Sequence, residues 1–195
     1  MADKVATDFI SKVKAKGKQA MSWFKDIVKK TRAAAFPAAT GRADIMDERN
    51  TGIQARPTIG RLYLFQYNAK WKDILPYWDV WPLIFPFDFA ANGFYGINLH
   101  YLPPNARIDL MLRLIKAQGV SGNLTDNYKL RLSYDIITNY PPAKPCIKRY
   151  LFSHVQGRGF YGIKGEDWSY AASLPLQKFK GASETTVWGD SKAMY

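Results

Sequence analysis

Cys146, His100 and His154 are the residues of this chain that could act as nucleophiles or zinc ligands. Zinc sites need clustered Cys and His, whereas these three lie far apart in the sequence. A Cys–His nucleophile pair is formally possible, but no flanking enzyme signature surrounds Cys146. Flanking lysines could lower the pKa of its thiol, yet such a cysteine is more often a small buried hydrophobic residue. We interpret His100, in an expected strand, as a hydrogen-bonded core histidine.

Carboxylates could bind a catalytic metal only if folding gathered them from distant positions. The candidates are Asp109, Asp126, Asp135, Glu166 and Asp167. Their spacing gives no reason to expect such a cluster, and the chain lacks the Gly-x-x-x-x-Gly-Lys-Ser/Thr phosphate loop. It also lacks a Gly-x-Gly-x-x-Gly motif after a strand, and we interpret the run Gly157-Arg158-Gly159 as a short glycine-rich turn. We therefore predict no catalytic residue, no metal site, no cofactor and no enzymatic activity. A nuclease stays open as an alternative.

Basic residues carry the clearer chemical signal, because 28 Lys and Arg oppose 16 Asp and Glu, a formal net charge of +12. Such an excess favours nucleic acid, an anionic membrane or an acidic protein neighbour, although it can also serve solubility alone. Exposed aromatic residues between the basic ones could stack on unpaired bases, but most should lie in the core. The predicted contacts with DNA or a partner are Lys12, Lys14, Lys16, Lys18, Lys29, Lys30, Lys148, Arg149, Arg158 and Lys164.

The N-terminal residues form a separate unit, which we bound at 1–57. Residues 1–35 combine apolar residues at helical spacing with many lysines, which predicts a cationic amphipathic helix. It could dock on its own domain or a sister subunit, contact DNA phosphates, or lie on a membrane surface. Residues 36–57 lack periodicity and predict an extended arm. No run of 18 apolar residues predicts a membrane span, and no secretory signal is recognised.

Residues 58–195 form the predicted folded domain. Of the 29 aromatic residues, 13 fall within residues 60–104, enough to build a β-rich core from few positions. The apolar patterns predict strands at 61–67, 83–89, 94–102 and 157–164. Pro86 predicts an edge or bulge in the second strand, and Asn92-Gly93 predicts a tight hairpin after it.

Helices should flank these strands. They are predicted at 106–118, 125–139, 146–155 and 166–174, with an extended tail at 181–195. On the first helix, Arg107 is expected away from the apolar side. The tetrapeptide Phe-Tyr-Gly-Ile at 94–97 and 160–163 predicts two strands whose glycines mark bulges or close backbone approaches. The fold class is therefore α+β: a small, bent antiparallel sheet or SH3-like barrel with flanking helices, preceded by the amphipathic helix and arm.

Three aromatic segments carry a family resemblance. They are Gly-x-Leu-Tyr-x-Phe-x-Tyr at 60–67, Leu-Pro-Tyr-Trp-Asp-x-Trp-Pro-Leu at 75–83 and Gly-Phe-Tyr-Gly-Ile-Asn-Leu-His-Tyr-Leu-Pro-Pro at 93–104. With later pieces such as Val-Trp-Gly-Asp-Ser-Lys, the chain from about 60 to 192 resembles a structural-protein family of contractile-tailed bacteriophages labelled DNA end protectors. The resemblance implies a virion protein that shields the genome terminus from exonuclease, and it brings no catalytic residue.

We therefore expect a non-enzymatic phage virion protein in a symmetric oligomeric assembly. Its basic surface would contact the genomic DNA end or other, acidic virion proteins. The alternative is a tail, neck or baseplate subunit whose arm clasps its neighbours, with no DNA role. One cysteine allows no internal disulfide, which fits the host cytoplasm during assembly and also the virion.

Overall fold

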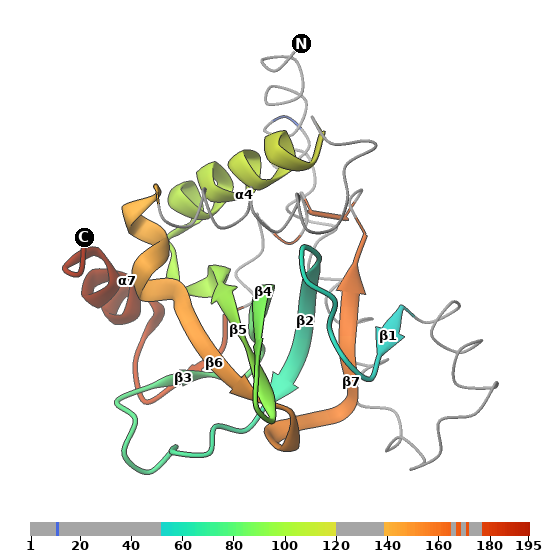
Figure 1. The fold of residues 1–195 in the computed structure, drawn as a ribbon. Helices are drawn as coiled ribbons and strands as arrows, with labels where there is room; N and C mark the ends of the chain where they lie inside the picture. Colours follow the sequence, from blue (N-terminus) through green and yellow to red (C-terminus); the bar gives the residue numbers. More distant parts are fainter. Residues whose placement is uncertain (1–10, 12–51, 120–138, 165–166, 169–170, 172–176) are drawn as a thin grey trace.

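The computed structural model describes residues 11, 52–119, 139–164, 167–168, 171 and 177–195 (Figure 1). Six antiparallel strands form one sheet in the order β1-β7-β2-β4-β5-β6. Their bounds are β1 Ile53–Gln54, β2 Leu62–Tyr67, β4 Leu83–Ala90, β5 Gly93–Asn98, β6 Ile147–Leu151 and β7 Val155–Ile163. The α+β class with an antiparallel sheet is thereby confirmed. The strand order describes an open sheet, so an SH3-like barrel is not confirmed.

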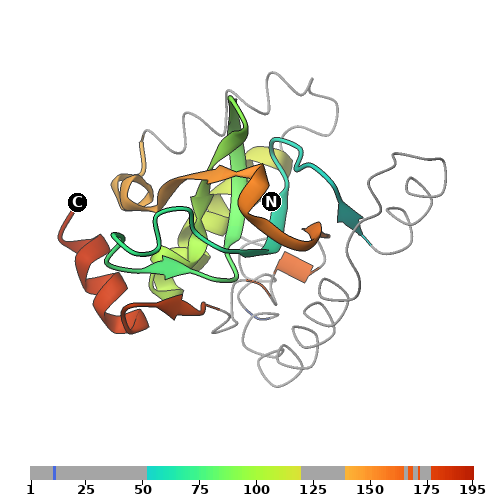
Figure 2. The same ribbon diagram turned by 90° about the horizontal axis from the view of Figure 1, so that it is seen from below.

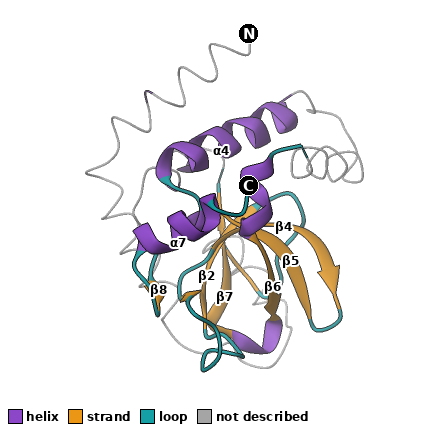
Figure 3. Ribbon diagram, turned by 90° about the vertical axis from the view of Figure 1, so that its left-hand side faces the viewer, coloured by secondary structure: helices purple, strands orange, loops and turns teal. Residues whose placement is uncertain are grey.

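The remaining elements surround this sheet. Helices α4 (Pro104–Gly119) and α7 (Glu184–Lys192) lie toward the same end of the sheet (Figures 1 and 3). A two-stranded ribbon pairs β3 (Trp78–Asp79) with β8 (Phe179–Lys180) beside α7 (Figure 2). Short 3-10 turns occupy η1 (Leu99–Tyr101), η2 (Pro141–Cys146) and η3 (Phe152–His154). Among the described residues, no helix has the length and apolarity needed to cross a membrane.

Strand β2 is apolar on both faces, as its sequence predicts. Leu62 and Leu64 join the cluster that packs against the helices, whereas Tyr63, Phe65 and Tyr67 join a second, aromatic cluster. Side chains alternate between the two faces of a strand, so a strand covered on both faces needs apolar residues at nearly every position. The sheet therefore separates a layer of mixed aliphatic and aromatic residues from a mostly aromatic one.

The β4–β5 hairpin also follows its sequence signals. Asn92 has a positive φ of 60°, as a tight turn between the paired residues Ala90 and Gly93 requires. Glycine is needed at 93 because a Cβ there would collide with the carbonyl oxygen of Tyr150 on β6. The register of the hairpin shifts between Pro86 and Asp88, which confirms the predicted bulge.

The predicted helix at 146–155 is wrong. The residues form β6 and η3 instead, because β6 pairs with β5 through partners such as Phe94 and Tyr150. Burying Tyr150 in the aromatic cluster outweighs local helical preference, a long-range effect invisible in the segment itself.

The predicted strand at 94–102 is also too long. It ends at Asn98, whose side-chain oxygen accepts a hydrogen bond from the His100 backbone N–H and starts η1.

The predicted extended tail at 181–195 is wrong as well, because α7 occupies most of it. The Ser183 hydroxyl accepts a hydrogen bond from the Thr186 N–H, and Glu184 and Lys192 suit the helix dipole at its two ends. Val187 anchors α7 in the core. A serine cap followed by an acidic first turn was therefore the signal that could have revealed this helix.

The helix predicted at 106–118 is confirmed as α4, which begins at Pro104. Leu110, Met111 and Leu114 are buried as expected, but Arg107 is also buried, contrary to its predicted place. Its guanidinium donates hydrogen bonds to the backbone carbonyls of Leu99 and Leu102, which explains the difference. The strand at 157–164 is confirmed within β7. The helices predicted at 1–35, 125–139 and 166–174 lie wholly or mostly outside the described residues, and the domain boundary at 57/58 stays a prediction.

Asp79 is the centre of a buried polar network. One carboxylate oxygen accepts hydrogen bonds from the backbone N–H groups of Trp81 (3.0 Å) and Lys178 (3.4 Å). The other accepts from Asn98 Nδ2 (3.2 Å) and His100 Nδ1 (2.7 Å). The carboxylate, which is buried, thus joins β3 to the end of β5, to η1 and to the segment that enters β8.

Arg107 places a compensating charge beside this network. Its side chain donates to the carbonyls of Leu99 (3.1 Å) and Leu102 (3.3 Å) and to Gln177 Oε1 (3.1 Å). Burial lowers the pKa of Arg107 to about 10, with the nearby Asp79 carboxylate opposing the shift, so the guanidinium stays charged at neutral pH. The start of α4 is thereby fixed to η1.

Replacing Asp79 with asparagine should strongly destabilise the fold. Asp79→Asn removes the negative charge that faces His100 and Arg107, and breaking one side of a buried ionic network costs about 3–5 kcal/mol. Urea denaturation would measure the loss, with Asp73→Asn in the exposed loop before β3 as the matched control. Equal free energies of unfolding for the two variants would contradict the network's importance.

Stability should also fall on mild acidification. Burial lowers the pKa of His100, and the Arg107 charge adds to this, while Asp79 opposes it. Below the ordinary histidine pKa of about 6.5, His100 is protonated in the unfolded chain but stays neutral in the folded one. Its contribution to the free energy of unfolding is therefore fully present above pH 6.5 and falls below it, by at most about 1.4 kcal/mol per pH unit. His100→Gln should flatten this dependence in urea titrations, whereas His154→Gln should not. A steeper dependence in His100→Gln would overturn the assignment.

Candidate functional site

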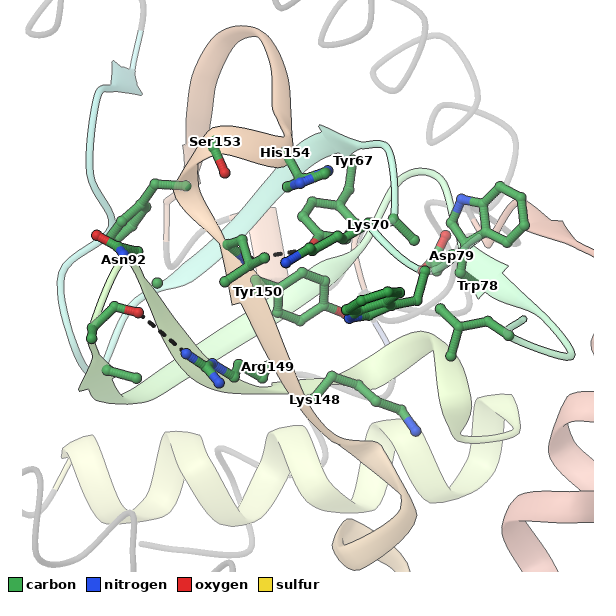
Figure 4. A pocket seen from close by; sticks show the side chains of 18 of the residues that line it. Tyr67, Lys70, Trp78, Asp79, Asn92, Lys148, Arg149, Tyr150, Ser153 and His154 are labelled. Atoms are coloured by element: carbon green, nitrogen blue, oxygen red, sulfur yellow. Dashed lines mark hydrogen bonds between the residues drawn. The ribbon is translucent and has the colours of Figure 1, made fainter. Parts of the chain in front are cut away.

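A broad groove of about 1320 Å³ opens over the aromatic layer of the sheet (Figure 4). Most of its lining comes from the loop between β2 and β3, the tip of the β4–β5 hairpin, strand β6 and turn η3. Arg56 after β1 and residues of β2, β3 and η1 complete it. Pockets for single drug-sized ligands are about 300–1,000 Å³. The groove is therefore large enough for a polymer segment.

Four basic side chains line the groove: Arg56, Lys70, Lys148 and Arg149. Among the described lining residues, Asp79 is the one carboxylate, and it is buried with both oxygens accepting hydrogen bonds. The exposed Arg149 donates a hydrogen bond to the Ala91 carbonyl (3.3 Å), which leaves further donors of its guanidinium for a ligand. The groove therefore presents excess positive charge.

Aromatic rings hold the other three cations in place. Lys148 Nζ lies 4.2 Å from the centre of the Tyr101 ring, and Lys70 Nζ lies 4.8 Å from that of Trp71. The Arg56 guanidinium lies 5.2 Å from the centre of the Phe152 ring. Each distance is within the range of a cation–π interaction. Burial lowers the pKa of Lys148, so an anion bound beside it would favour its charged form.

The floor of the groove is rigid. Tyr67 and Tyr150 pack edge to face with ring centres 4.9 Å apart, and Phe65 packs beneath both. The Tyr67 hydroxyl accepts a hydrogen bond from Leu151 N–H (3.3 Å), and the Tyr150 hydroxyl accepts one from Asn98 Nδ2 (3.1 Å). Burial raises the pKa of both tyrosines, so their hydroxyls stay neutral near pH 7.

The rim of the groove, by contrast, exposes large apolar side chains. Trp71 is 58% exposed on the β2–β3 loop, and Phe89 is 47% exposed near the hairpin tip. Leu75 adds a smaller exposed surface beside Trp71. Rings on the rim and cations between them can bind a chain that carries both flat groups and negative charges.

Acid–base chemistry has less support in this groove. His100 is fully buried and does not belong to the lining, and His154 Nδ1 lies 2.9 Å from the Asn68 carbonyl oxygen. The described part of the chain contains no group of three or more His, Cys, Asp or Glu placed to bind a metal. His100 is a hydrogen-bonded core residue as predicted, although it lies in η1 and not in a strand.

Cys146 is buried, and its thiol lies 3.3 Å from the Pro142 carbonyl oxygen. Burial raises the pKa of the thiol to about 12, more than the neighbouring cations lower it. Since the thiolate is the reactive form, Cys146 is inert near neutral pH. The interpretation as a small hydrophobic core residue is confirmed.

Two of the predicted contact residues, Lys148 and Arg149, come together in the groove. Arg158 on β7 and Lys164 just after it lie outside the groove lining. The six predicted lysines of the N-terminal helix lie outside the described residues. They are Lys12, Lys14, Lys16, Lys18, Lys29 and Lys30.

Four further residues were missed by the sequence analysis: Arg56, Lys70, Trp71 and Phe89. Lys70 and Trp71 stand in a Lys-Trp-Lys run within a long loop, and this juxtaposition was the available signal. Arg56 follows an edge strand, and nothing in the sequence distinguished Phe89 from the aromatic residues of the core. Their meeting depends on tertiary structure.

A family model described as "Phage T4 terminal DNA protecting protein" matches residues 2–191, nearly the whole chain. The match extends over the N-terminal residues, which the resemblance noted in the sequence did not include. No curated protein and no solved structure matches the chain.

Proposed function

We propose a function from one premise: the chain belongs to the phage T4 terminal DNA protecting protein family. On this premise it is a non-enzymatic virion protein that binds the end of the phage genome and shields it from exonuclease. The observation that carries the proposal is the groove in which Arg56, Lys70, Lys148 and Arg149 meet.

Phosphate binding follows from the charge of that groove. Lysine and arginine that neutralise DNA phosphates release counterions, which supplies much of the affinity of DNA-binding proteins. Arg149 retains guanidinium donors for a phosphate, and arginine can bind phosphate through two parallel hydrogen bonds. We place the terminal phosphates in the groove. Arg158, Lys164 and the N-terminal lysines would extend the contact along the duplex.

A protective role without cleavage suits the state of Asp79. Both of its oxygens accept hydrogen bonds inside the fold, so binding a metal would require breaking the contacts that hold β3 and η1. Shielding an end needs only that the protein occupy it more tightly than a nuclease does. The basic groove supports such occupation.

Other virion proteins are the second partner that we propose. Ile74 is 76% exposed and adjoins the partly exposed Leu75 on the β2–β3 loop. Exposed apolar side chains in one place favour a protein neighbour. In this arrangement the N-terminal arm of residues 1–57 would clasp adjacent subunits of a symmetric assembly in the virion or, during assembly, in the host cytoplasm.

Removing one groove arginine should weaken DNA binding in a salt-dependent way. Arg149→Ala should reduce affinity for a linear duplex and lower the slope of log affinity against log salt by about 0.9, the contribution of one phosphate contact. Arg61→Ala, also exposed but outside the groove, is the control. Equal slopes for the two variants would remove Arg149 from the interface.

The protein should protect linear DNA and leave it uncut. With Mg²⁺ or Mn²⁺ alone, we expect end-labelled linear DNA to stay intact; after a processive exonuclease is added, the protein should slow its digestion. Closed circular DNA controls for internal cutting. Metal-dependent cleavage that is abolished by changing an Asp or Glu would establish a nuclease and overturn the proposal.

A further inference from the structure

We propose that the groove binds unpaired nucleotides at the DNA terminus, with bases stacked on Trp71 and Phe89. The inference rests on the proposed function, because it takes the DNA end as the partner. Beyond the proposed function, the inference specifies the part of the DNA end that enters the groove. That part is a single-stranded extension or a frayed strand, and not the side of the duplex.

Trp71 offers one stacking surface. More than half of its side chain is exposed, although the turn that carries it is fixed. The Trp71 carbonyl accepts hydrogen bonds from the N–H groups of Ile74 (3.0 Å) and Leu75 (2.9 Å). The Lys70 ammonium lies over one face of the Trp71 ring, so a base would stack on the opposite face or displace the ammonium, which could then pair with a phosphate of the strand.

Phe89 offers a second surface from the hairpin. The hairpin tip is fastened to β6 and η3, because Arg149 donates to the Ala91 carbonyl and the Phe152 N–H donates to the Asn92 carbonyl (3.0 Å). Both stacking rings therefore lie on backbone segments that hydrogen bonds hold in place. Preorganisation of this kind reduces the ordering cost of binding.

The combination of rings and cations favours an unpaired strand over a duplex. Inside a duplex each base is stacked on both faces and unavailable to a protein ring, except at the last pair. Exposed rings between cations are the arrangement by which proteins bind single strands, with bases on the rings and phosphates on Lys and Arg. The groove volume exceeds that of a drug-sized site, which suits more than one nucleotide.

An apolar protein segment is the competing occupant. It would cover Trp71 and Phe89, but it would leave Arg56, Lys70, Lys148 and Arg149 without counter-charges. Burying unpaired charges is costly, whereas a nucleic acid strand supplies a phosphate for every base. The charge of the groove therefore favours DNA.

The test compares a blunt duplex, the same duplex with a short 3′ or 5′ oligo-dT extension, and the free single strand. The full-length protein should bind at least one extended duplex about tenfold or more tightly than the blunt one, the effect of stacking one base. Trp71→Ala and Phe89→Ala should reduce this gain, measured as the ratio of the affinity for the extended duplex to the affinity for the blunt one. Tyr195→Ala, whose side chain is 45% exposed outside the groove, should retain the gain.

A second measurement locates the strand independently of affinity. Bromodeoxyuridine placed in the extension should form a photo-crosslink to Trp71, identified by mass spectrometry. Crosslinks confined to residues outside the groove would overturn the inference.

The outcomes separate this inference from the proposed function. Equal affinity for blunt and extended ends, with both ring variants behaving as wild type, overturns the inference and leaves end protection intact. Failure to bind any DNA overturns both. If the ring variants bind all DNA forms normally yet fail to enter virus particles, the groove is a protein site and the inference is wrong.

Discussion

The buried carboxylate of Asp79 is the constraint on which the rest of this structure depends. A charge can be removed from water only if hydrogen bonds and opposite charge replace the lost solvation, and here four donors and the nearby Arg107 do so. Those donors come from segments far apart in the chain. Satisfying one carboxylate therefore fixes β3, the end of β5, η1 and the approach to β8 relative to each other.

The shape of the groove depends on the hydrogen bonds of Asp79. Asn98, which donates to Asp79, also donates to Tyr150 in the groove floor, so floor and network are one hydrogen-bonded unit. The aromatic layer beneath gives that floor stiffness, and the exposed rings and cations lie on segments attached to it. Most aromatic residues therefore serve as scaffold, while a few on the rim are available for recognition.

Local signals in the sequence were sufficient for part of the fold. The alternation in β2, the bulge at Pro86, the turn at Asn92 and the helix α4 were predicted because each depends on neighbours in the chain. Strand β6 and the burial of Arg107 were not, since their partners lie far away in the sequence.

The site was predictable to a smaller degree. Lys148 and Arg149 were proposed from charge alone, whereas Arg56, Lys70, Trp71 and Phe89 meet them only through tertiary structure. Neither composition nor spacing could distinguish the exposed rings of Trp71 and Phe89 from those of the core. The aromatic motifs at 60–104, however, carried a resemblance that the family match confirmed.

The most direct test of the proposed function is a density map of the protein bound to a DNA terminus, either as an isolated complex or within the virus particle. We expect the strand end to lie in the groove against Lys70 and Arg149; DNA bound elsewhere, with another protein filling the groove, would contradict the proposal.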